Sequence, residues 1–500
     1  MSAAAPLSAR PGRRDLLKKF GWTSLASIVQ MIAGLASVIV LTRFLMPSDY
    51  GLYGIALMAV AAGEVLTGGV LSSPIEQKAE ITRAGMNTAF WANAGLALAY
   101  SAVILPASAL IAGAAGYAEV MPVIAAACLL MVITAFGIVP ESLLRRRQAF
   151  RQLAQVGVVA ALTGLAAGIA LAASGAGVWS LIGLEVVRRL IVAASNFTLA
   201  RWRPDGGLDM SALRASLPFV SGMLAANVLG RIDRLAPQVA ATIFFGPAGL
   251  GLLAVATRIA DQIQAFVAQP VGAMALPVLS DAARDPSRFH TLMADAWRAI
   301  AIVSFPMLTG FAAIAPLLVP MAVGGAFANA GMIAAITVLA QVRIVSSKVN
   351  LAATQAAGKA LTASASIALS VAAHIVLLAL LAPLGILAIA AASVLRGWLT
   401  WPFAAWFVKS TTGFSMRRQA AILAPPLAAS LVMGIAVYAL SQVLQLQMPA
   451  LVALAILMMA GALLYAIILW LLDPWVRCAL ASGRFRRLET GGLQIAERPA

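Results

Sequence analysis

Charged residues are scarce in this chain: Asp, Glu, Lys and Arg make up 11% of its 500 residues, whereas 62% are hydrophobic. Soluble domains carry about 25% charged residues, so the scarcity excludes an ordinary soluble protein. Cysteine is also nearly absent. One of the two cysteines lies in an apolar run and the other in a basic tail, which excludes a disulfide framework and a cysteine-based metal site. We therefore expect no metal and no cofactor.

Two motifs are missing as well. The sequence contains no Walker motif or other ATP-binding signature, so we do not expect direct ATP drive. It shows no cleavable signal peptide either, because the first apolar run is too long and leads into a second one. External loops large enough to hold the catalytic acids of a membrane enzyme are also lacking. We accordingly expect a protein that is not an enzyme.

The charges that are present are mostly basic, and the net charge is +17. They stand in short clusters after every second apolar run, which is typical of the positive-inside rule and not of a nucleic-acid-binding face. The opposite loops carry almost no Lys or Arg. This pattern predicts that both termini are cytoplasmic and that nucleic acid is not a partner. The clusters are Lys78/Arg83, Arg145/Arg146/Arg147/Arg151, Arg201/Arg203/Arg214, Arg284/Arg288, Lys359 and Lys409/Arg417/Arg418.

The apolar runs predict an all-α integral membrane protein with about fourteen transmembrane helices. Each run is long enough to cross a hydrocarbon layer of about 30 Å at about 1.5 Å per residue. The predicted helices span residues 20–42, 51–73, 88–113, 119–139, 153–173, 177–200, 216–244, 248–276, 296–321, 328–351, 360–382, 384–408, 418–441 and 449–472.

An internal repeat organises these helices. Residues 44–53 align without a gap with residues 244–253, so that Pro47 matches Pro247 and Gly51 matches Gly251. Each Pro starts a helix, and each Gly lets backbones approach. The repeat predicts two parallel six-helix lobes around a central cavity, with two C-terminal helices appended. The predicted parts are a basic tail (1–19), a first lobe (20–202), a linker (203–215), a second lobe (216–409), helices 13 and 14 (410–476) and a second basic tail (477–500).

Charged residues inside the predicted helices are the candidate site residues, because a charge at membrane depth normally faces a bundle interior or a water-filled cavity. Cations outnumber carboxylates among them, and Arg binds phosphate bidentately, so the cavity should attract an anion. The candidate substrate-binding residues are Arg188, Arg189, Arg231, Arg234, Arg258, Arg343 and Arg396. The candidates for coupling to a proton or sodium ion are Glu64, Asp233 and Asp261.

Several of these residues also have a structural interpretation. Glu185 can pair on one helix face with Arg188 and Arg189, which follow it by three and four residues. Asp233 and Asp261 can neutralise the arginines near them on the paired helices. Lys348 can snorkel to the membrane interface, and His374 can act as a proton relay or simply bond a neighbouring helix. The sequence leaves these alternatives open.

Five segments resemble the bacterial polysaccharide-exporting flippases of the Wzx type, which translocate lipid-linked oligosaccharides. They are IVLTRFLMPSDYGLY (39–53), NTAFW (87–91), PESLLRR (140–146), GVWSL (177–181) and RIDR (231–234). This family belongs to the multidrug/oligosaccharidyl-lipid/polysaccharide exporter superfamily, whose fold is fourteen helices in two lobes. Arg234 stands where the resemblance leads us to expect Asn, which makes the cavity more basic and weakens the ion-coupling role implied for Asp233.

The resemblance implies movement of an undecaprenyl-pyrophosphate-linked oligosaccharide from the cytoplasmic to the outer leaflet of the bacterial inner membrane, by alternating access. It also implies as partners the membrane lipids and the polysaccharide polymerase and glycosyltransferases of the same pathway. Three alternatives stay open: a flippase for a peptidoglycan precursor of the lipid II type, a cation-coupled drug antiporter and a membrane enzyme. The basic interior disfavours the drug antiporter, and the short external loops disfavour the enzyme.

Overall fold

The computed structural model describes residues 13–67, 72, 75–76, 81–115, 119–282, 285–356, 360–444 and 449–481. Every regular element in these ranges is a helix, which confirms the predicted all-α class. Ten of the described helical segments are long and apolar enough to cross a membrane. A bilayer core offers no hydrogen-bond partners to exposed backbone groups, so helices are a suitable spanning structure. The chain is therefore a multi-pass membrane protein, and the count of fourteen spans stays a prediction.

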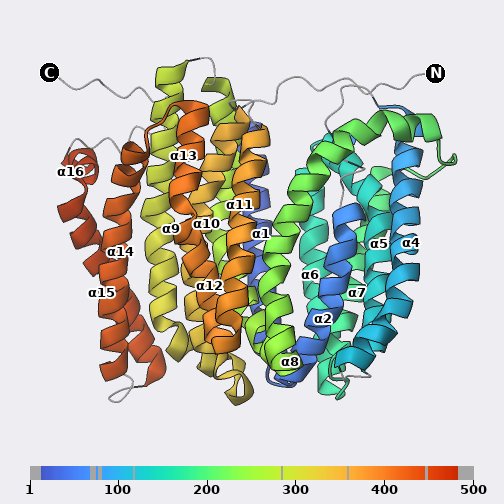
Figure 1. Cartoon of the computed structure of the whole chain (residues 1–500), viewed down its shortest axis with the longest axis horizontal. Coiled ribbons are helices and arrows are strands. Elements are labelled where there is room, and N and C mark those ends of the chain that lie inside the picture. Colours follow the sequence, from blue (N-terminus) through green and yellow to red (C-terminus); the bar gives the residue numbers. More distant parts are fainter. Residues whose placement is uncertain are drawn as a thin grey trace.

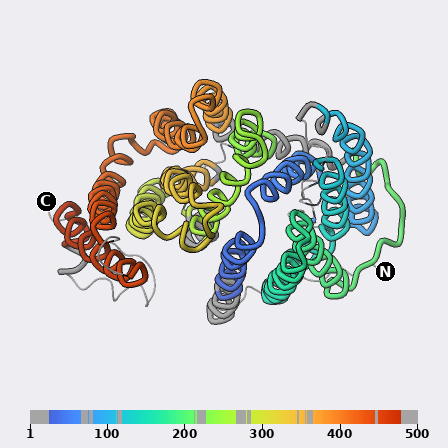
Figure 2. The backbone as a smooth tube through the Cα atoms, turned by 90° about the horizontal axis from the view of Figure 1, so that it is seen from below, coloured from blue at the N-terminus to red at the C-terminus, as the bar shows by residue number. Residues whose placement is uncertain are grey.

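The helices fall into two groups, which Figures 1 and 2 show from the side and from below. The first group comprises α1 (Arg13–Leu41), α2 (Pro47–Thr67), α4 (Arg83–Ala115), α5 (Val120–Arg146), α6 (Phe150–Ala173) and α7 (Trp179–Ala200). The second comprises α8 (Met210–Ala282), α9 (Pro286–Val323), η1 (Gly325–Phe327), α10 (Ala330–Ala356), α11 (Ala360–Leu381), η2 (Ala382–Leu384), α12 (Ile386–Leu399) and α13 (Trp401–Thr412). It continues into α14 (Met416–Leu444), α15 (Ala450–Leu472) and α16 (Pro474–Ala481). Within the described residues, each predicted span falls on a helix, or in one case on the pair α12 and α13. Residues 68–71 and 73 of the predicted span 51–73, most of both predicted basic tails, and Lys78, Arg284 and Lys359 lie outside the described residues.

Two predicted spans fall on α8, which is a hairpin of two arms, 210–245 and 247–282. The break is at Gly246, whose φ of 64° and ψ of −166° are readily adopted only by glycine. Pro247 then opens the second arm, at the turn that the sequence predicts. The first arm begins at Met210, six residues before the predicted start, because the Asp209 carboxylate accepts a hydrogen bond from the Ser211 N–H and caps the helix there.

The turns of the two repeats cross each other at close range. A Cβ atom placed on Gly51 would lie 1.8 Å from the carbonyl oxygen of Pro247. A Cβ atom placed on Gly251 would likewise lie 1.8 Å from the carbonyl oxygen of Pro47. Two glycines therefore let the backbones of α2 and α8 touch, and Figure 1 shows these helices side by side. A contact that is the same in both directions is what an approximate two-fold axis between two repeats produces.

The segment between the two groups is fixed to the beginning of α4. The Asp205 carboxylate accepts hydrogen bonds from Asn87 at 2.9 Å and from Arg83 at 2.8 Å, and the Trp91 indole donates to the Gly206 carbonyl at 2.8 Å. The hydrogen bond from Asn87, helped by the charge of Arg83, lowers the pKa of Asp205. Residues of the NTAFW segment thus hold the linker.

The basic run at the end of α5 forms an ion pair and hydrogen bonds with other residues of the protein. Arg145 pairs with Glu141 one turn earlier, with 2.7 Å between Nη2 and the carboxylate. Arg146 donates to the carbonyl of Ile75, and Arg147 donates to the carbonyl of Ala200 at the end of α7, both at 2.8 Å. This run therefore satisfies carbonyl groups of neighbouring segments, in addition to providing positive charge at one membrane face.

The C-terminal helices attach to the second group through α9. The Tyr465 hydroxyl of α15 donates to the Ile302 carbonyl of α9 at 2.9 Å. Gly434 of α14 packs against Thr309 of α9, where a Cβ atom would be 3.5 Å from that side chain. These contacts place α14 and α15 at the outer side of the second group, away from α2 and α7 (Figure 2).

Candidate functional site

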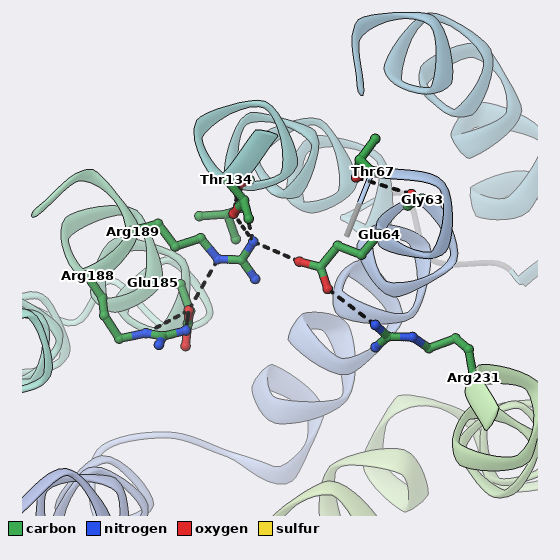
Figure 3. A network of polar contacts seen from close by, with 9 residues as sticks. Gly63, Glu64, Thr67, Thr134, Glu185, Arg188, Arg189 and Arg231 are labelled. Atoms are coloured by element: carbon green, nitrogen blue, oxygen red, sulfur yellow. Dashed lines mark hydrogen bonds and ion pairs between the residues drawn. The ribbon is translucent and has the colours of Figure 1, made fainter. Parts of the chain in front are cut away.

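Glu64 of α2 links the two helix groups by ion pairs. Its Oε1 accepts a hydrogen bond of 2.9 Å from Arg189 of α7, and its Oε2 lies 3.7 Å from the guanidinium of Arg231 on α8. Figure 3 shows Arg189 and Arg231 reaching this carboxylate from opposite sides. Arg189 is held further by the Thr134 hydroxyl at 2.7 Å and the Leu130 carbonyl at 3.2 Å. The first group thus positions one guanidinium firmly, and the second group supplies the other.

Glu185 of α7 makes the second set of ion pairs. It is 5% exposed, and its carboxylate lies 2.5 Å from Arg188 and 3.6 Å from Arg189 on its own helix. It also lies 3.7 Å from Arg258 on the second arm of α8. The Arg258 guanidinium sits over the Tyr53 ring of α2, 5.8 Å from the centroid. Glu185 therefore pairs with its helical neighbours, as their spacing indicates, and reaches across to α8 as well.

These contacts join into one chain of charges, which we name the arginine–glutamate chain. It begins at Arg231 and ends at Arg258, so both ends lie on α8 and the middle lies on α2 and α7. Its members are Glu64, Glu185, Arg188, Arg189, Arg231 and Arg258. Four guanidinium groups face two carboxylates, which leaves two formal positive charges in excess. Such an excess at membrane depth favours the approach of an anion.

A second charged site lies inside the second group. Both carboxylate oxygens of Asp233 on α8 have partners: Oδ1 lies 2.8 Å from Nδ1 of His374 on α11, and Oδ2 accepts a hydrogen bond from Arg396 on α12. The other ring nitrogen of His374 lies 3.2 Å from the Ser393 hydroxyl of α12. Asp233 thus pairs with a cation from another helix and not with an arginine of its own hairpin. His374 bonds two neighbouring helices.

This second site borders a cavity of about 520 Å³, which we name the second-lobe cavity. Its walls come from α8, α10, α11, α12 and α13. Asp261 lies in the wall and accepts a long hydrogen bond of 3.4 Å from Gln341. Arg343 is buried, and its side chain packs against Gly397, where a Cβ atom would be 3.1 Å from its Cγ. The charged lining residues are Asp233, Arg234, Asp261, Arg343, Lys348 and Arg396.

Helix α8 is the wall between the two sites. Arg231 and Asp233 are two residues apart, which is a rotation of about 200° and a rise of about 3 Å, so they lie at one depth on opposite faces. The structure accordingly brings the candidate residues together in two sets. Between the groups, Glu64 pairs with Arg189 and Arg231, and Glu185 pairs with Arg188, Arg189 and Arg258. Within the second group, Arg234, Arg343 and Arg396 line the second-lobe cavity together with Asp233 and Asp261.

The polysaccharide biosynthesis protein family matches residues 40–332, which is more than half of the chain. The match includes the α8 hairpin, α2 and α7. The chain belongs to this family. The matched residues include every member of the arginine–glutamate chain and the α8 side of the second-lobe cavity.

Two curated relatives share part of the sequence. The succinoglycan biosynthesis transport protein ExoT of Rhizobium meliloti is 23% identical over 302 residues, which is 60% of this chain and 61% of the relative. The lipopolysaccharide biosynthesis protein WzxC of Escherichia coli is 21% identical over 309 residues, or 61% of this chain and 62% of the relative. The similarity thus spans about three-fifths of the length of each relative.

Solved structures share the fold over more of the chain. The lipid II flippase MurJ, in an inward closed conformation, superposes with a TM-score of 0.73 at 15% identity and covers 90% of this chain and 98% of its own. A multidrug resistance MATE family transporter of the MOP superfamily, in an inward-facing conformation, superposes with a TM-score of 0.56 at 15% identity. It covers 78% of this chain and 99% of its own. These similarities establish a shared fold and confirm the predicted class.

Neutral residues of both sites were not among the predicted site residues. Thr134 holds Arg189, Ser393 faces His374, and Gln341 faces Asp261. Ser, Thr and Gln are common in membrane helices, where their side chains often bond the backbone or other helices, so their presence in a sequence gives no signal. For Ser393 one signal exists: it precedes Arg396 by three residues and therefore lies on the same helix face.

Proposed function

We propose that the protein is a flippase that moves an undecaprenyl-pyrophosphate-linked oligosaccharide from the cytoplasmic to the outer leaflet of the bacterial inner membrane. The family membership, the names of the two relatives and the fold shared with the lipid II flippase support this proposal. The observation that carries it is the arginine–glutamate chain, because it places four guanidinium groups at the boundary of the two helix groups.

The diphosphate of such a substrate is an anion that the guanidinium groups of the arginine–glutamate chain can bind. Guanidinium groups bind phosphate oxygens through paired, charge-assisted hydrogen bonds. In the structure the carboxylates of Glu64 and Glu185 occupy the guanidinium donors. A diphosphate entering between the groups competes with these carboxylates for Arg231 and Arg258, which are 32% and 29% exposed at their side chains. The lipid tail can stay in the bilayer beside the site.

The proposed mechanism is alternating access by rocking of the two lobes, with the boundary of the lobes in the linker. Breaking the contacts of Arg231 with Glu64 and of Arg258 with Glu185 removes the ion pairs between α8 and the helices α2 and α7, while the backbone contact at Gly51 and Gly251 remains. Anion binding therefore removes the ion pairs that hold the lobes together, which links substrate binding to movement. An ion gradient or the membrane potential supplies the driving force. Membrane lipids, the polysaccharide polymerase and the glycosyltransferases of the pathway are the proposed partners, and both termini are cytoplasmic.

A flippase for a lipid II-type peptidoglycan precursor is the second candidate, since the fold superposes on the lipid II flippase with a TM-score of 0.73. The two candidates share the diphosphate and the lipid and differ in the glycan. A competition assay in proteoliposomes separates them: the proposed function requires that a lipid-linked oligosaccharide repeat unit displaces labelled substrate better than lipid II does. The reverse order would favour the second candidate.

The proposal is tested by the double variant Arg231→Ala/Arg258→Ala. Both substitutions remove guanidinium groups that α8 contributes to the arginine–glutamate chain. We expect loss of surface polysaccharide in cells that depend on this gene copy, with folded protein still present in the membrane. The measurement is polysaccharide export together with the amount of membrane-extracted protein.

The matched control is Arg83→Ala/Arg145→Ala, which removes two arginines from exposed ion pairs outside both sites. Exposed pairs contribute about 0–1 kcal/mol, so export by this control should equal that of the unmodified protein. Normal surface polysaccharide in the Arg231→Ala/Arg258→Ala variant would refute the proposed role of the arginine–glutamate chain.

A further inference from the structure

The second-lobe cavity contains a histidine in a position suited to bind and release a proton. His374 is 2% exposed, and both ring nitrogens have partners: Nδ1 faces the Asp233 carboxylate and Nε2 faces the Ser393 hydroxyl. We propose that His374 is the ion-binding group of the second lobe and that the ion is a proton. The inference deepens the proposed function and rests on it for the identity of the transported anion.

The contacts satisfy both protonation states of the imidazole. In the neutral state Nδ1–H donates to Asp233 and Nε2 accepts from the Ser393 O–H. After proton uptake from cavity water, Nε2–H donates to the same hydroxyl oxygen, since a hydroxyl both donates and accepts and rotates to suit. No covalent bond other than the new N–H forms or breaks. Histidine is also the side chain that ordinarily changes charge near neutral pH.

The same contacts oppose a sodium ion at Asp233. One carboxylate oxygen already faces Arg396, whose positive charge neutralises the acid, and the other faces His374. Four cationic side chains stand against two carboxylates around the cavity, and this excess of positive charge opposes any cation equally, so the choice of ion depends on ligands: sodium needs free oxygen ligands, whereas a proton needs only the imidazole nitrogen. In addition, no group of three or more His, Cys, Asp or Glu side chains suited to a metal ion occurs among the described residues.

Protonation of His374 changes the charge that an anion bound at the arginine–glutamate chain meets from the second-lobe cavity, because α8 is the wall between the two sites. The titratable and charged groups that line it are Asp233, Arg234 and Asp261 from α8, Arg343 and Lys348 from α10, His374 from α11 and Arg396 from α12. A proton raises the formal excess from two to three positive charges, so an anion should bind more tightly. By linkage the anion must then raise the affinity of His374 for the proton by the same factor.

The test uses methanedisulfonate, a diphosphate-shaped dianion whose charge is constant across the pH range in which histidine titrates. Its affinity is measured by calorimetry on the purified full-length protein at several pH values. We expect the affinity to fall by roughly 5- to 150-fold as His374 loses its proton. The variant His374→Gln should bind with an affinity that does not change with pH. Replacement of sodium by potassium in the buffer should leave the affinity for methanedisulfonate unchanged in both proteins.

His290→Gln is the matched control. His290, the other histidine of the sequence, lies on α9, forms a hydrogen bond of 2.7 Å with the Thr412 carbonyl and does not line the cavity. This control must keep the pH dependence of the unmodified protein. A pH-independent affinity in the unmodified protein, an unchanged pH dependence in His374→Gln, or a sodium-dependent affinity would each overturn the inference while leaving the anion-carrying function intact.

A second measurement needs no anion. Histidine-selective NMR in the absence of methanedisulfonate follows the two imidazoles, and His374→Gln identifies its resonance. A His374 signal that titrates supports the proton site even if no dianion binds, in which case the proposed anion-carrying function is what fails. A His374 signal that stays constant across the range in which imidazole normally titrates overturns the proton site.

Discussion

At the scale of residues, the two glutamates determine how the arginines between the lobes are held. Each guanidinium of the chain would be an uncompensated charge at membrane depth without Glu64 or Glu185 beside it. Under the proposed function, the carboxylates therefore compensate these guanidinium groups while no substrate is bound. A substrate that supplies its own negative charge makes them dispensable, so their removal should weaken the empty protein more than the loaded one.

Glu64→Gln is the variant that measures this difference. We expect the empty protein to lose about 1–3 kcal/mol of stability, because Arg189 and Arg231 lose their shared carboxylate while Arg189 keeps Thr134 and Leu130. Methanedisulfonate should stabilise this variant more than it stabilises the unmodified protein. Thermal unfolding of purified protein with and without the dianion gives both values. Equal stabilisation of the two proteins would contradict the idea that substrate and carboxylate compete.

Which residues carry charge at depth was predictable, but their partners were not. Arg231 and Asp233 are conspicuous in an apolar run, so the sequence indicates them directly. Which neighbour each one meets depends on how α8 is rotated, and two positions along a helix turn a side chain by about 200°. Asp233 therefore meets Arg396, which is 163 positions away, and not the nearby Arg231. No local pattern contains that pairing.

At the scale of elements, the hairpin of α8 and the start of α2 form the structural centre of the molecule. Gly51 and Gly251 lie where backbones touch, and each faces the proline of the other repeat. A methyl group at either position has no space, because the atom it meets is a backbone carbonyl oxygen that cannot rotate away. The steric requirement explains why the two repeats keep the same residue.

Gly51→Ala and Gly251→Ala should therefore destabilise the protein to a similar extent. We expect each to cost about 1–3 kcal/mol or more, as overpacking against a rigid partner does. The matched control is Gly95→Ala in α4, where nothing lies within 4 Å of the added Cβ atom. Alanine there should stabilise the helix by roughly 0.5–1 kcal/mol. Thermal unfolding of the three variants checks the order, and an equal effect at all three positions would contradict the crossing.

Element boundaries show what local signals can and cannot give. The turn at Gly246–Pro247 was predictable because glycine and proline each restrict the backbone in a known way. Less visible was the end of α12 at Leu399, within a predicted span of 384–408. Pro402 lies in the first turn of α13, where a residue without an N–H is tolerated. In the interior of a continued α12, the same proline would remove a backbone hydrogen bond and break the helix. The apolar run continues across this break and conceals it.

At the scale of the whole molecule, the distribution of basic residues and the arrangement in two lobes predict one orientation in the membrane. Lys and Arg gather in the loops after every second span. This bias sets orientation during insertion, since such loops are retained in the cytoplasm. The sequence made this prediction possible because it depends on the positions of Lys and Arg between the apolar runs and needs no knowledge of helix contacts.

Fusions of reporter proteins measure the orientation. Green fluorescent protein attached after Ala500 should fluoresce, and alkaline phosphatase attached at the same position should be inactive, because the C-terminus is predicted in the cytoplasm. Phosphatase attached after Leu384, between α11 and α12, should be active, because that loop is predicted outside. The opposite pattern of activities would show that the chain is inserted the other way round.

The crossing of Gly51 with Pro247 and of Gly251 with Pro47 has a consequence for transport kinetics. Under the proposed alternating access, the lobes have to separate at this junction whenever the protein opens on the side of the turns. The junction then opens and closes once per turnover, and the strength of its packing should determine how long the exit stays closed. Loosening it by a mutation that preserves folding would hasten release and allow small solutes to leak.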